Sequence, residues 1–157
     1  MKVALLFILL LLSLSLSSCD PLIFKVVIDD NGFEKSFNFE CGKADVSCGV
    51  LVDIQLVAGF RLKLDSPILI VPEELKITHN IIPLDPSIRF EERFRSFSIR
   101  EQRIIDNDGE LFISVNSNHQ SRFRVGDTVT INIDNFIICR EKSLEIGDIN
   151  LILVHRK

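Results

Sequence analysis

Four cysteines are the residues of this chain whose types and spacing most directly suggest chemistry: Cys19, Cys41, Cys48 and Cys139. Cys41 and Cys48 each continue an alternating apolar run, on either side of a segment, 42–47, that fits a hairpin loop. Opposed residues of an antiparallel pair lie about 4.5–5.5 Å apart at Cα, which is within disulfide range. We therefore predict a Cys41–Cys48 disulfide. A bridge from Cys139 to either thiol is the alternative; otherwise Cys139 is free.

A second candidate site is a run of arginines interleaved with phenylalanines. Such interleaving can bind anionic groups of a glycan or a lipid. Three nearby glutamates lower the excess charge of this stretch to +2, which favours a solvated, salt-bridged face. If the protein has an anionic ligand, we predict that it binds the face formed by Arg89, Arg93, Arg95, Arg100 and Arg103.

Catalytic and metal-binding patterns are absent from the sequence. It has no Gly-x-Ser-x-Gly motif and no glycine-rich phosphate or dinucleotide loop, so we assign no catalytic residue and no cofactor. His79, His119 and His155 are scattered without zinc-ligand spacing. His79 continues the alternation of Leu75 and Ile77, so we expect it to be partly buried. Asp106 begins a stretch like a calcium loop, but Ser117 stands where the last acidic ligand is required. Paired carboxylates could still meet in space, so a hydrolase remains an alternative.

Strands must position these residues, because apolar and polar residues alternate along most of the chain. The clearest runs lie at 50–56, 60–64, 75–78, 111–115, 128–134 and 149–154. We predict an all-β fold, an immunoglobulin-like antiparallel sandwich of about 7–9 strands, with a small β-barrel as the alternative. We expect most of the twelve Phe residues to fill its core.

Two turn signals and one irregular segment complete this picture. Asp29–Gly32 and Asp106–Gly109 each predict a tight hairpin between the strands on either side. Asp85 and Pro86 could begin a helix, with Phe90, Phe94 and Phe97 on one face. We therefore predict a short helix or irregular crossover to about Arg95, followed by a strand; one continuous strand would need a bulge.

The N-terminus has the order of a secretory signal peptide: a charged start, an apolar stretch and then small residues. The last four residues of this region, Leu16-Ser17-Ser18-Cys19, match a lipobox position by position, so the segment resembles the signal peptide of bacterial lipoproteins. The mature part shows no such family resemblance.

The resemblance implies cleavage between Ser18 and Cys19, a diacylglyceryl group on the Cys19 thiol, and usually an acylated new amino terminus. Residues 1–18 are then the signal peptide, 19–22 a short tether, and 19–157 a single β domain. The protein would be exported and anchored to a membrane, in the periplasm or at the cell surface. The alternative is an ordinary secreted protein whose Cys19 joins a disulfide.

Size and charge narrow the function classes. Cleavage before Cys19 shortens the chain from 157 to 139 residues, enough for one domain with a proper core. The net charge of −4, which becomes −5 without Lys2, does not suggest nucleic acid as a partner. We therefore expect a membrane-anchored binding or assembly module with a protein or glycan partner. A purely structural subunit is a further alternative.

Overall fold

A computed structural model of the chain describes residues 24–28, 34–51, 55–116, 122–143 and 147–155. The predicted signal peptide, lipobox and tether lie outside these residues. The all-β prediction is confirmed: the described residues form fifteen strands, one 3-10 turn, η2 (Pro72–Glu74), and no α-helix. The strands number more than the predicted 7–9 because short strands, such as Ile82–Leu84, Ile137–Cys139 and Lys142–Ser143, lie outside the alternating runs. The predicted run at 50–56 is wrong, since one strand ends at Leu51 and the next begins at Gln55.

The strands pair into three antiparallel sheets, and none of the three closes into the barrel that was the alternative prediction. The five-stranded sheet has the order β1 (Phe24–Ile28), β15 (Asp148–His155), β12 (Thr128–Asn132), β6 (Lys76–His79), β7 (Ile82–Leu84). The six-stranded sheet has the order β2 (Glu34–Phe39), β3 (Gly42–Leu51), β4 (Gln55–Leu64), β11 (Gly109–Asn116), β8 (Pro86–Glu92), β9 (Arg95–Ser98). The four-stranded sheet has the order β10 (Arg103–Ile105), β5 (Ile68–Ile70), β13 (Ile137–Cys139), β14 (Lys142–Ser143).

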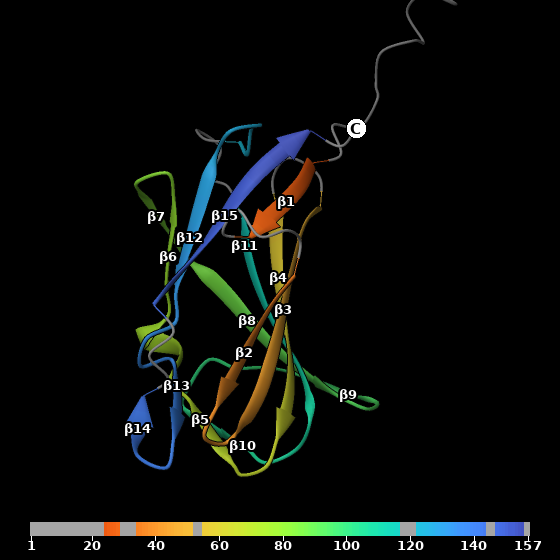
Figure 1. The fold of residues 1–157 in the computed structure, drawn as a ribbon, viewed down its shortest axis with the longest axis vertical. Coiled ribbons are helices and arrows are strands. Elements are labelled where there is room, and N and C mark those ends of the chain that lie inside the picture. Colours follow the sequence, from red (N-terminus) through yellow and green to blue (C-terminus); the bar gives the residue numbers. More distant parts are fainter. Residues whose placement is uncertain (1–23, 29–33, 52–54, 117–121, 144–146, 156–157) are drawn as a thin grey trace, which may run out of the picture.

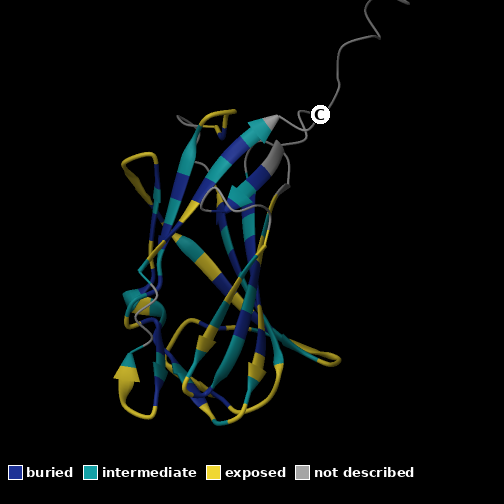
Figure 2. Ribbon diagram, in the orientation of Figure 1, coloured by how far each residue is buried: buried dark blue, intermediate teal, exposed yellow. Residues whose placement is uncertain are grey.

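One hydrophobic core joins the three sheets. The five- and four-stranded sheets follow one another along the long axis, and the six-stranded sheet runs beside them (Figure 1). Alternation explains the burial: on β4, Leu56, Ala58, Phe60 and Leu62 are all buried, whereas Arg61 between the last two is exposed. Buried residues accordingly line the interior between the layers (Figure 2).

Neither of the two predicted hairpins connects neighbouring strands. β1 pairs with β15 and β2 pairs with β3, so the chain changes sheets across the loop that contains Asp29–Gly32, which itself lies outside the described residues. Likewise β10 pairs with β5, whereas β11 lies between β4 and β8. In both cases the strands on either side of the predicted hairpin belong to different sheets.

The predicted helix before Arg95 is also wrong. Residues 86–92 form β8, the chain turns at Arg93–Phe94, and β9 runs back beside β8. Phe90 and Phe97 face each other across this hairpin, with ring centroids 5.5 Å apart, whereas Phe94 is fully exposed at the tip. The turn resets the alternation, so no bulge is needed.

Gly109, at the start of β11, allows the close approach of β8. A Cβ atom there would overlap the Phe90 ring and lie 2.6 Å from the Glu91 carbonyl oxygen. We expect Gly109→Ala to lower the free energy of unfolding by about 2 kcal/mol, measured by urea denaturation, because the sheet must shift to admit the methyl group. Gly49→Ala is the matched control, since no atom lies within 4 Å of the place its methyl group would take; equal losses in both variants would contradict this account.

Candidate functional site

The disulfide joins Cys41 to Cys139, with the two Cα atoms 5.9 Å apart, and Cys48 is free. The predicted Cys41–Cys48 bridge is therefore wrong, and Cys41 is bridged to the alternative partner, Cys139. The reason is the β2–β3 turn. It lies at Glu40–Cys41 rather than over 42–47, which become part of β3. Cys48 is thus carried seven residues along β3, about 23 Å at the rise of a strand.

The bridge ties the β2–β3 turn of the six-stranded sheet to β13 of the four-stranded sheet. The Cys41 carbonyl also accepts a hydrogen bond from the Asp65 amide, at 2.8 Å, so the end of β4 meets the same point. Cys48, by contrast, opposes Ala58 of β4, and burial raises the pKa of its thiol to about 12. A thiol with that pKa is not a nucleophile at neutral pH, and Cys48 is a structural residue.

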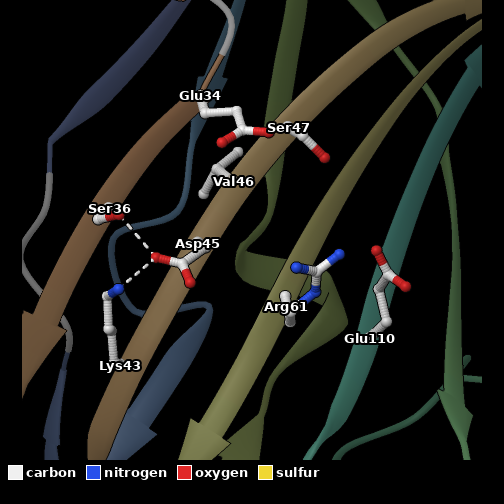
Figure 3. A pocket seen from close by; sticks show the side chains of 8 residues that line it. All are labelled: Glu34, Ser36, Lys43, Asp45, Val46, Ser47, Arg61 and Glu110. Carbon is white, nitrogen blue, oxygen red and sulfur yellow. Dashed lines mark hydrogen bonds and ion pairs between the residues drawn. The ribbon is translucent and has the colours of Figure 1, made fainter.

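The polar face of the six-stranded sheet carries a hollow of about 270 Å³ (Figure 3). Cross-strand pairing brings Asp45 of β3, Arg61 of β4 and Glu110 of β11 into one row. In the next row Gly59 stands between Ser47 and Phe112. Because Gly59 has no side chain, it leaves a notch bordered by the Glu110 carboxylate, the Phe112 ring and the Ser47 hydroxyl. Glu34, Ser36, Lys43 and Val46 complete the lining.

The charges in this hollow suit recognition of a polar ligand. Asp45 accepts hydrogen bonds from Lys43 Nζ at 2.8 Å and from Ser36 Oγ at 2.6 Å, and these two contacts lower the pKa of its carboxyl group. The guanidinium of Arg61 lies between the side chains of Asp45 and Glu110 (Figure 3). An ionised Asp45 is an acceptor and not a proton donor at neutral pH, so it lacks the raised pKa of a general acid.

Sequence reasoning did not single out this hollow. Apart from the buried Val46, each of its residues occupies the solvent side of an alternating strand, which is the ordinary place for a charged side chain. Only the pairing of β2, β3, β4 and β11 shows that the charges share one site.

The structure distributes the five predicted arginines over two sheets. Arg89 lies on β8, 3.1 Å from the Glu91 carboxylate and over the Phe112 ring at 5.3 Å. Arg103 lies on β10 of the four-stranded sheet and stacks on the Phe97 ring at 3.8 Å. The guanidinium groups of Arg89 and Arg103 are therefore held by neighbouring side chains.

The remaining arginines lie on or beyond the β8–β9 hairpin. Arg93 and Arg95 flank the exposed Phe94 at its tip. The hairpin protrudes sideways from the lower part of the molecule, far from the C-terminal end of β15 (Figure 1). Arg100 follows β9 and lines a separate surface hollow of about 670 Å³. Binding of an anionic ligand by this set stays a prediction, now centred on the hairpin tip.

The buried His79 and the partly buried Asp127 form a pair at one end of the five-stranded sheet. The His79 side chain is 2% exposed, and its Nε2 lies 2.7 Å from Asp127 Oδ2. The Phe123 ring packs on the imidazole with centroids 4.8 Å apart, and His79 Nδ1 has no hydrogen-bond partner. The parity of Leu75 and Ile77 predicted a partly buried His79, and the structure places it deeper.

Asp127 also holds two backbone turns. Its carboxylate accepts hydrogen bonds from the Arg124 amide at 2.7 Å and from Asn80 Nδ2 at 3.3 Å. Partial burial opposes ionisation of Asp127, but the hydrogen bonds from His79, the Arg124 amide and Asn80 outweigh it and lower its pKa. An ionised, hydrogen-bonded Asp127 thus locks the β6–β7 turn to the turn before β12.

Metal binding finds no geometric support in the described ranges: no three His, Cys, Asp or Glu side chains gather there in a way that could hold an ion. His119 and the side chain of His155 lie outside what the structure describes. No helix within the described residues has the length and apolar character needed to cross a membrane.

Comparison of the chain with protein-family models, with curated proteins and with solved structures found no match. The function must therefore be argued from the residues and their arrangement.

Proposed function

We propose that this protein is an exported, membrane-anchored module that binds or assembles with a partner and is held to the membrane by a lipid on Cys19. The observation that carries the proposal is the lipobox-like segment Leu16-Ser17-Ser18-Cys19 after an apolar N-terminal run. The Cys41–Cys139 disulfide supports export independently, because structural disulfides persist in oxidising compartments. The disulfide also accounts for the odd number of thiols that remain once Cys19 is lipidated. One bridge uses two of these three thiols, and Cys48 is left unreactive.

The binding role rests on two surface features. The hollow on the six-stranded sheet offers carboxylates, hydroxyls and the Arg61 guanidinium beside the Phe112 ring, a combination that suits a polar ligand such as a glycan. The β8–β9 hairpin presents a fully exposed Phe94 between two arginines, a pairing typical of protein-contact residues. We further propose that the two layers around one core form an immunoglobulin-like sandwich, a scaffold suited to such surfaces.

A hydrolase is the second candidate, because Asp45, Glu110 and Glu34 do converge on one hollow from three strands. The lowered pKa of Asp45 favours the binding role over acid catalysis.

The anchor is tested by replacing the lipidated thiol. We expect the mature wild-type protein, extracted from membranes, to have an intact mass above that of the chain from Cys19 by the mass of the attached lipid. Cys19→Ser removes the acceptor, so the protein should leave the membrane fraction without gaining lipid mass. Cys48→Ser is the matched control and should stay lipidated. A wild-type mass equal to that of the unmodified chain would refute the anchor.

A further inference from the structure

Exposed aliphatic side chains gather at one end of the five-stranded sheet. Ile81, in the turn between β6 and β7, is 90% exposed, its neighbour Ile82 is 42% exposed, and Val125, in the turn before β12, is 41% exposed. These turns form exposed tips at the upper end of the molecule in Figure 2. Two adjacent turns that both expose branched aliphatic side chains form an apolar patch, unlike single residues scattered over a surface.

The ladder places this patch at the end where the chain enters the domain. Val27 of β1 pairs with Ile152 of β15, which pairs with Thr128 of β12, and the Asn80 amide donates to the Thr128 carbonyl at 2.6 Å. Ile81 follows Asn80 and lies just beyond this row of paired residues. It lies toward the end of the sheet where β1 begins at Phe24. The C-terminal end of β15 reaches the same end of the molecule (Figure 1).

The anchor holds this end near the membrane. Five residue steps separate Cys19 from Phe24, a reach of at most about 18 Å in any conformation. A lipid on Cys19 therefore keeps the patch close to the bilayer, whereas the β8–β9 hairpin, which carries Phe94, protrudes sideways from the distant lower part of the molecule (Figure 1).

Charge at this end favours an anionic bilayer. Arg122 and Arg124, which flank the buried Phe123, are both exposed beside the patch. The carboxylate of Asp127 is turned inward, to His79 and the Arg124 amide. Exposed arginines next to an exposed aliphatic side chain suit the headgroup layer of a membrane with negative lipids.

The two turns are rigid rather than loosely attached. Asn80 has a φ of 54° and its Oδ1 accepts from the Thr128 amide at 3.1 Å, while the Gly126 amide donates to the Leu153 carbonyl at 2.8 Å. Asp127 joins the two turns from below. Presenting the patch on a fixed framework lowers the entropy lost when it contacts a surface.

From this arrangement we propose that Ile81, Ile82 and Val125 form a membrane-contact surface, which enters the headgroup layer of the anionic bilayer that holds Cys19. The inference rests on the proposed function, because the lipid supplies the proximity. It adds that the domain lies against the bilayer by this end, with the β8–β9 hairpin and its Phe94 far from the lipid.

Tryptophan fluorescence tests the contact directly, because the chain contains no Trp of its own. The lipidated Ile81→Trp protein is reconstituted into phosphatidylcholine vesicles with and without phosphatidylglycerol. With the anionic lipid, we expect a shift of emission to shorter wavelength and quenching by brominated acyl chains. Both effects should be smaller in neutral vesicles and at high salt, where charge attraction is absent or screened.

The matched control is Phe94→Trp, which puts the same reporter on an exposed tip far from the patch. We expect its emission to be the same in detergent and in vesicles. Unchanged emission of the Ile81→Trp protein in anionic vesicles, or equal shifts in the two variants, would overturn the membrane contact. If the Ile81→Trp emission shifts in detergent as protein concentration rises, the patch binds a second copy of the chain, which also overturns it.

Failure of the anchor is recognised separately. The intact mass of each reconstituted protein reports whether Cys19 carries lipid. A lipidated Ile81→Trp protein whose tryptophan stays in water refutes the contact surface and leaves the anchor standing. An unmodified mass refutes the anchor itself.

Discussion

Replacing both bridged cysteines, as Cys41→Ala with Cys139→Ala, is expected to lower the free energy of unfolding by about 4 kcal/mol. The bridge closes a loop between residues 98 apart in sequence, so its removal releases a large conformational freedom in the unfolded chain. Domains of this size are stable by roughly 5–15 kcal/mol in total, so the reduced protein should be close to the limit of folding at growth temperature.

Urea denaturation of the wild type, with and without dithiothreitol, measures this effect. We expect the reduced wild type and the double variant to unfold at the same, lower urea concentration. Cys48→Ala is the matched control and should cost no more than about 1 kcal/mol, since Cys48 forms no disulfide. A destabilising Cys48→Ala together with a neutral double variant, or a Cys41–Cys48 peptide in a non-reducing digest, would show that the pairing is different.

Asp127→Ala is expected to lower the free energy of unfolding by about 3 kcal/mol. The substitution leaves the imidazole of His79 buried without its remaining partner, and it also removes the acceptor of the Arg124 amide. Breaking a buried hydrogen-bonded pair by removing one member costs more than the pair contributes, because the other member stays desolvated. Asp127→Asn keeps one oxygen acceptor and should lose less.

The lowered pKa of Asp127 determines in which direction its contribution to stability changes with pH. The pKa of Asp127 lies below its ordinary value of 3.8 in the folded protein, so the folded state binds this proton less readily than the unfolded state. The stabilisation is therefore fully present above about pH 4 and is lost as the pH falls through the lowered folded value. We expect the difference in stability between wild type and Asp127→Asn to shrink as the pH falls below about pH 4.

An exposed carboxylate provides the control for this series. Asp85→Ala removes an exposed acidic side chain and should change the stability by less than about 0.5 kcal/mol. If Asp85→Ala and Asp127→Ala had equal effects, or if the gap between wild type and Asp127→Asn widened towards acid pH, the buried pair would not be the cause. Loosening of the two turns should also weaken the vesicle signal of the Ile81→Trp reporter, which links this stability test to the proposed membrane contact.

Local pattern alone determined several of the strands and which side of each faces the core, although the predicted run at 50–56 spans the end of β3 and the start of β4. The alternation at 60–64, 111–115, 128–134 and 149–154 predicted β4, β11, β12 and β15, because the side-chain period of a strand is two whatever its neighbours are. The same parity predicted that His79 lies on the inner side of β6. Alternation failed around Phe94, where a two-residue turn shifts the register and imitates the spacing of a helix.

Pairing between distant segments was decided only by the tertiary structure. The turn residues at Asp106–Gly109 signalled a change of direction, but which sheet receives the next strand depends on the apolar surface that each strand must cover. Three features of the protein depend on that choice of pairing. They are the thiol partner of Cys41, the contact of His79 with Asp127, and the row of Asp45, Arg61 and Glu110. No local spacing encodes them, because His79 and Asp127, 48 positions apart, meet only when β6 pairs with β12, and Cys41 and Cys139, 98 positions apart, meet only when two sheets pack.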